Sequence, residues 1–179
     1  MKTHIRITTR LTVALLCAAG FCLLPNAKAA EESKATTESK LSMNDKKFLK
    51  KAYRGGMEEV ENAKVAKEKA KNDATKEVAD RMITDHTQAN EELKKIAEEE
   101  HLDLSKIQAK TMKVSETNFD KEYLTMLKKD HEKDIAEFEK EASDTGAKED
   151  SDVVAYAKKT LPTLNEHLKM VEDALAKTQ

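Results

Sequence analysis

Residues 123–142 have the sequence YLTMLKKDHEKDIAEFEKEA, and this stretch decides the fold class. Its apolar residues recur at intervals of three and four positions, which is the period of one face of an α-helix. Most other positions are Lys or Glu, which favour helix and suit a solvated face. The polar pair Asp130-His131 interrupts the apolar face near its middle, and Asp134 projects near the centre of that face. This stretch therefore predicts a long helix that carries polar side chains toward a core.

Three further segments share this pattern, and few residues interrupt helix between them. After residue 41 the breakers are Gly55, Gly56, Gly146 and Pro162. Start signals bracket four helices of about 26–28 residues each. They are Ser42 with Asp45 for a helix over 43–71, Asn72 or Asp73 for 74–101, Thr117 with Asp120 for a helix ending near Ala142, and Asp150 or Ser151 for a helix ending near Lys177. Four helices of matched length predict an all-α antiparallel four-helix bundle.

The link between the second and third helices, about 102–116, is longer than the other two links. Some 14 residues at about 3.3 Å each could cross the length of the bundle, as in ferritin-like folds. A compact loop would instead give plain up-down-up-down order. Periodicity leaves both alternatives open.

The N-terminal residues are typical of export. Lys2, Arg6 and Arg10 precede an apolar run from Leu11 to Leu24, and small residues at 27–29 complete the pattern of a secretory signal peptide over 1–29. Residues 30–41 are polar and predict a flexible leader, so the folded domain is expected over 42–179. We expect a mature protein in the cell envelope, most simply the Gram-negative periplasm, with no membrane anchor after cleavage and no cysteine, because both cysteines lie in the signal.

The charge of the mature chain excludes one class of partner. Without Lys2, Arg6, Arg10 and Lys28, 28 basic residues remain against 34 acidic ones, a net charge near −6. The two signs alternate along the helices, whereas nucleic-acid binding needs a basic stripe. We therefore predict no nucleic acid as partner; an envelope protein remains a candidate, and no oligomeric state follows.

Projection of each helix at about 100° per residue brings several acids and histidines to the apolar faces. They are Glu59, Asp85, His86, Asp130, His131, Asp134 and His167. Glu59 and His86 are predicted at the same depth, and His131 and His167 about one turn apart. Oxygen and nitrogen donors at one level of a bundle suit a divalent metal such as Fe, Mn, Zn or Cu.

A metal-free interpretation stands beside this one. Buried Asp, His and Glu side chains can satisfy one another as a structural polar layer. The sequence also lacks the Glu-x-x-His pairs of di-iron bundles, because Ile83, Lys128 and Leu164 stand three residues before the histidines.

Four segments together resemble one known family. They are GGMEEVENAK (55–64), RMITDHTQANEEL (81–93), YLTMLKKDHEKDIAEFEKEA (123–142) and KTLPTLNEHLKM (159–170). Their order is similar to that of the exported bacterial "domain of unknown function 4142" family, often labelled an outer-membrane protein. The resemblance implies a ferritin-like four-helix bundle with the long crossover, and it supplies no activity.

Three functions from different classes follow from these patterns. The leading hypothesis is a non-enzymatic, exported bundle that works in the cell envelope through binding, with a metal held by the acids and histidines named above. The second is a periplasmic metal-dependent oxidoreductase that consumes iron or peroxide. The third is a metal-free structural or stress-related interaction module.

Overall fold

The computed structural model describes residues 40–113, 117–144 and 151–178, which belong to a compact unit spanning Thr36–Gln179. They form four helices: α1 (Met43–Lys69), α2 (Asp73–Glu99), α3 (Phe119–Ala142) and α4 (Asp152–Ala176). The predicted all-α class is confirmed, and the helix ends lie within about two residues of those expected. The predicted signal peptide, and the leader apart from its last two residues, lie outside the described residues.

Local sequence explains where three of the helices begin. Ser42 and Asp45 form the predicted capping box of α1, with each side chain accepting from the other residue's backbone N–H. The side chain of Asn72 caps α2 by accepting from the N–H of Ala74, which resolves the two candidates predicted there. Ser151 is the N-cap residue of α4.

The predicted capping box of α3 was wrong, although its start lies within one residue of the expected position. Its N-cap is Asn118 rather than Thr117, and Asp120 makes no capping box. The Asp120 carboxylate instead accepts from the backbone N–H groups of Lys71 and Asn72, in the turn between α1 and α2. Asp120, which the local pattern predicted as part of the N-cap of α3, therefore makes a tertiary contact instead.

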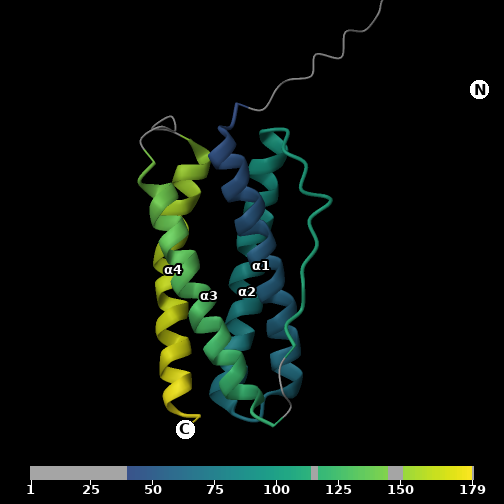
Figure 1. The fold of residues 1–179 in the computed structure, drawn as a ribbon, viewed down its shortest axis with the longest axis vertical. Helices are drawn as coiled ribbons and strands as arrows, with labels where there is room; N and C mark the ends of the chain where they lie inside the picture. The colour runs from purple at the N-terminus through teal and green to yellow at the C-terminus, as the bar shows by residue number, and fades with distance from the viewer. Residues whose placement is uncertain (1–39, 114–116, 145–150, 179) are drawn as a thin grey trace, which may run out of the picture. The chain divides into compact units, whose positions relative to one another are not determined.

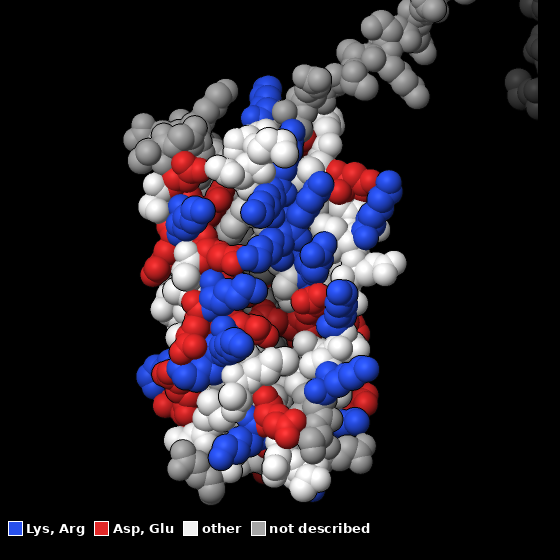
Figure 2. Space-filling view, in the orientation of Figure 1, with Lys and Arg blue, Asp and Glu red and all other residues white. Residues whose placement is uncertain are grey.

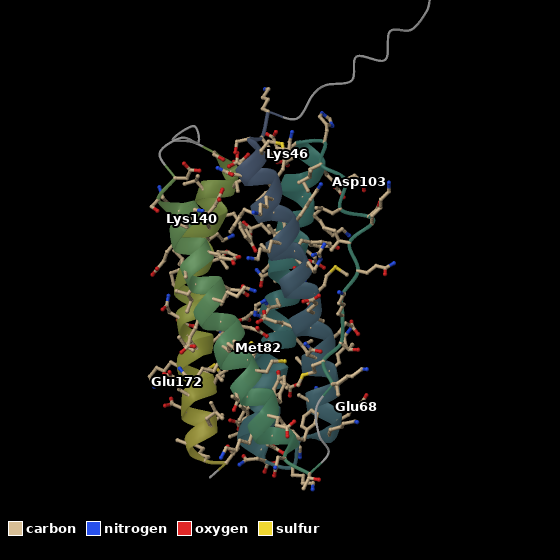
Figure 3. All side chains as sticks on the ribbon, viewed as in Figure 1. Lys46, Glu68, Met82, Asp103, Lys140 and Glu172 are labelled. Carbon is tan, nitrogen blue, oxygen red and sulfur yellow. The ribbon has the colours of Figure 1, made fainter. Side chains whose placement is uncertain are left out.

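The helices pack with α1 against α2 and α3, and with α4 against α2 and α3 (Figure 1). Lys46 and Lys140 lie at one end, while Glu68 and Glu172 lie toward the other (Figure 3). The start of α1 thus lies at the same end as the end of α3, and α4 ends at the opposite end, so helices that pack against each other run in opposite directions.

The connection between α2 and α3 runs along the outside of α1 over the length of the helices (Figure 1). It is fixed to α1 by two backbone donors: the N–H of Lys110 donates to Glu58, and that of Met112 donates to Asn62 at 2.8 Å. Of the two alternatives for this link, the structure contains the long crossover, which makes α2 and α3 parallel and diagonal.

Two apolar clusters make up the core, one toward each end of the helices. One contains Met82, Tyr123, Leu127 and Val171, and the other contains Phe48, Leu93, Phe138, Tyr156 and Leu164, among others. Between them, every helix contributes a buried polar residue to a middle layer. The fold therefore encloses a polar layer between two apolar clusters.

The surface carries both signs of charge side by side (Figure 2). Lys and Arg gather over the N-terminal half of α1, where Lys46, Lys47, Lys50, Lys51 and Arg54 fall within nine positions. None of the helices in the described part of the chain combines the length and the apolar character needed to cross a membrane.

Candidate metal centre

Each helix places one residue in the buried middle layer: Glu59 from α1, His86 from α2, His131 from α3 and His167 from α4. Their exposed fractions are 5%, 7%, 0% and 1%, respectively. We refer to these four residues as the histidine layer. The predicted common depth of Glu59 and His86 is correct, because Oε2 of Glu59 lies 2.8 Å from Nε2 of His86.

His131 and His167 face each other across the layer, with 3.2 Å between Nε2 of His131 and Nδ1 of His167. The predicted offset of about one turn, counted from helix ends that the structure confirms within about two residues, does not prevent this contact between the two rings.

The outer nitrogen of each of these two rings is held by a hydrogen-bond acceptor. Nδ1 of His131 donates to the carbonyl oxygen of Leu127 at 3.1 Å, because a carbonyl can only accept, and it also lies 3.2 Å from Oε1 of Glu59. Nε2 of His167 donates to Oδ2 of Asp85 at 2.8 Å, and Asp85 is itself paired with Arg81. In the neutral rings, the two facing nitrogens therefore both carry lone pairs.

Burial favours these neutral forms. Burial lowers the pKa of His167 to about 4, although its bond to Asp85 works in the opposite direction. Burial likewise lowers the pKa of His131, against the effect of the Glu59 charge. A proton shared between the two rings would require an imidazolium, which burial disfavours in both of them.

Glu59 and His86 form the other half of the layer, a carboxyl group beside an imidazole. Burial alone would raise the pKa of Glu59, but the charge and contact of His86, and then the charges of His131 and His167, lower it to about 2. Burial would lower the pKa of His86, but the Glu59 charge outweighs it and raises that pKa. Although the pair is close, neither Glu59 oxygen nor Nε2 of His86 is aligned for a hydrogen bond. These buried atoms lack the directional partners that such groups normally have.

The donor atoms fit a small divalent cation. One nitrogen from each of His86, His131 and His167 lies within 4.8 Å of the other two. Two ligands at 2.0–2.1 Å from a tetrahedral ion are about 3.3–3.4 Å apart, close to the 3.2 Å between His131 and His167. A carbonyl and a carboxylate on the outer ring nitrogens are the partners that orient metal-bound histidines. Glu59 adds a carboxylate beside His86.

The three predicted aspartates occupy different positions. Asp85 holds His167 and lies outside the trio of converging nitrogens. Asp134 lies near α1, where a Cβ on Gly55 would be 3.8 Å from its Oδ2, and burial with the Glu59 charge raises its pKa to about 7. Asp130 is half-buried. The converging nitrogens therefore include that of His131, which is fully buried, and the converging group contains neither Asp130 nor Asp134.

Sequence reasoning missed two residues that shape the site. Arg81 pairs with Asp85 one turn away on α2, a spacing that the sequence displays. Asn90 lies one turn from His86 on the same face, is 9% exposed, and its Oδ1 has no hydrogen-bond partner. The projection that selected His86 also selects Asn90, but an amide does not stand out as a metal ligand.

The fold and the histidine layer define a class: an all-α bundle whose four helices each bring a histidine or carboxylate to one buried level. The particular family is shown by its sequence profile, described as "Domain of unknown function (DUF4142)", which matches residues 30–174. The chain belongs to this family. No curated protein and no solved structure matches the chain.

Proposed function

We propose that this protein is an exported cell-envelope bundle whose function is to bind one divalent first-row transition-metal ion in the histidine layer. His86, His131 and His167 supply imidazole nitrogens, and Glu59 supplies the carboxylate that offsets part of the cation's charge. The observation that carries the proposal is the pair of facing nitrogens 3.2 Å apart, each with its outer partner already assigned.

The donor set favours some metals over others. Three imidazoles and one carboxylate suit Zn²⁺, Cu²⁺, Ni²⁺ and Fe²⁺ better than Mg²⁺ or Ca²⁺, which prefer oxygen ligands. Affinity for such a site generally rises from Mn²⁺ to Cu²⁺ and falls again at Zn²⁺. We therefore expect Cu²⁺ and Zn²⁺ to bind more tightly than Mn²⁺. The basic and apolar N-terminal pattern of residues 1–29 supports export, where no cysteine of the mature chain would compete for the ion.

Elemental analysis of the exported protein tests this proposal. The full-length chain is expressed without a tag, and the mature product is purified from the periplasm without chelators. His86→Ala/His131→Ala removes two ligands, and His101→Asn is the matched control, since His101 is the remaining histidine after residue 29 and lies exposed beyond α2. Asn suits this control because the φ of His101 is 55°, a left-handed conformation that Asn tolerates.

We expect near-stoichiometric metal in the wild type and in His101→Asn, and none in the double variant. A wild type that is metal-free and takes up no added Zn²⁺ or Cu²⁺ would refute metal binding. That result would support the metal-free structural polar layer instead.

A further inference from the structure

A small cavity adjoins the histidine layer on the side nearer the N-terminus of α1. Glu59, His86 and His167 line it from the layer, and Gly56, Asn90 and Asp134 line it one turn further along. Its volume is about 30 Å³, and a cavity needs roughly 10–15 Å³ to hold one water molecule. The cavity therefore has room for about two water-sized groups.

The wall of the cavity is mostly apolar, and the Asn90 side chain is one of the polar groups that line it. A Cβ on Gly56 would lie 2.4 Å from Oδ1 of Asn90, so only glycine lets the Asn90 amide pack at this position. This Oδ1 is buried and accepts no hydrogen bond from the protein. A buried acceptor without a hydrogen bond lowers the stability of the folded protein, unless a molecule with an O–H or N–H group donates to it.

From these observations we infer that the metal centre is open on this side, and that the cavity holds an exchangeable ligand of the metal. The ligand is water or another protic molecule of no more than two heavy atoms. It binds the ion between His86 and His167 and donates a hydrogen bond to Asn90. This inference rests on the proposed function and deepens it, because structural sites are closed by protein ligands whereas reactive sites keep an open position.

The alternative occupants fit less well. A larger organic molecule exceeds the volume, and an anion would meet the side chain of Glu59, which lines the cavity. A purely apolar filling would leave the Asn90 oxygen unsatisfied.

The test uses the full-length exported protein loaded with Cu²⁺, and water enriched in ¹⁷O as the probe. Pulsed electron paramagnetic resonance detects hyperfine coupling from an oxygen bound directly to copper. Asn90→Leu keeps the approximate side-chain shape and removes the unsatisfied oxygen, so the cavity loses this hydrogen-bond acceptor. Asn165→Leu is the control, because Asn165 is exposed and bonds to Leu161 within its own helix.

We expect ¹⁷O coupling in the wild type and in Asn165→Leu, and its loss or at least a severalfold reduction in Asn90→Leu, with copper still bound. Copper bound in the wild type without ¹⁷O coupling would show a closed site, which overturns this inference and leaves the proposed function standing. Equal coupling in Asn90→Leu would also overturn it, because the ligand would then not depend on the cavity. Failure of the wild type to bind copper would overturn both.

Discussion

At the scale of residues, the histidine layer depends on groups that hold the ligands as well as on the ligands. Asp85 accepts from Nε2 of His167 and is itself paired with Arg81, so it fixes both the ring orientation and the tautomer of His167. Burial would raise the pKa of Asp85, but its bonds to His167 and Arg81 lower it, so the carboxylate is ionised at neutral pH.

Asp85→Asn should therefore weaken zinc binding without abolishing it. The amide removes the negative charge that makes His167 a stronger ligand, and the loss of such an outer partner typically costs 10–100-fold in affinity. Competition titration of Zn²⁺ against a chelating dye measures the change. Asp80→Asn serves as control, since Asp80 is exposed and pairs with Lys67 instead. Equal affinities in the two variants would show that Asp85 does not support the site.

Sequence could predict the members of the layer better than their mutual contacts. Glu59 and His86 were predictable because a short turn joins α1 and α2, so counting residues from the turn fixes their depth. The contact between His131 and His167 was not, because α4 begins only at Asp152, beyond a longer link. Projection of the third helix also placed Asp134 near the centre of the apolar face, whereas its side chain is only partly buried. A wide apolar face leaves the direction of its centre uncertain by tens of degrees.

At the scale of elements, the sequence did not determine the path of the crossover between α2 and α3. Its length allowed either a compact loop or a crossing, and the choice depends on hydrogen bonds between residues about 50 positions apart. Asn62 is buried in α1, and its Oδ1 accepts a hydrogen bond from the backbone N–H of Met112. The side chain of Asn62 thus supplies the partner that this N–H, which lies outside any helix, would otherwise lack.

Asn62→Ala should release this part of the crossover while the four helices remain. We expect a loss of about 1 kcal/mol in the free energy of unfolding, the usual net contribution of one hydrogen bond. Hydrogen exchange should show the Met112 amide losing protection, with the helix amides unchanged. Asn165→Ala removes an amide that bonds within α4 and should affect neither. Retained protection at Met112 would mean that other contacts hold the crossover.

The contact between the start of α1 and the end of α3 should depend on pH. Glu141 is buried, and burial together with the negative charge of Asp45 raises its pKa to about 7. The folded protein therefore keeps a proton that the unfolded chain loses near its ordinary pKa of about 4.5. Linkage then requires stability to be greatest below that pH and to decline as the pH rises toward 7.

Glu141→Gln should remove this decline, because the amide cannot ionise. Thermal unfolding of the metal-free proteins between pH 4 and 8 measures it as the difference between the two curves. The wild type should lose stability relative to the variant between about pH 4.5 and 7, and the difference should be constant above that range. If stability changed with pH in the same way in the wild type and in Glu141→Gln, ionisation of Glu141 would not be the cause of the decline.

At the scale of the whole molecule, the polar layer divides the core between its two apolar clusters. Buried charges without a cation stabilise a fold little, because their desolvation offsets their attraction. The middle of the metal-free bundle is therefore its least stabilised level, and metal binding should act there.

Zinc should raise the thermal stability of the protein in proportion to the logarithm of its concentration. At a free concentration of about 100 times Kd, binding adds about 2.7 kcal/mol, or roughly 5–10 °C in the unfolding temperature of a domain of this size. Differential scanning calorimetry measures the shift. His86→Ala/His131→Ala should show no dependence on zinc, whereas His101→Asn should match the wild type. A shift that persists in the double variant would place the stabilising zinc elsewhere.

The distribution of the layer over all four helices has a consequence for maturation. His131 and His167 are 36 positions apart, and Glu59 and His86 belong to the other pair of helices. A helical hairpin formed early holds at most two of the four groups, so a partly folded chain offers the ion no complete set of donors. Metal capture would then be a late event that distinguishes finished molecules from unfinished ones. The bound ion would report that all four helices have assembled.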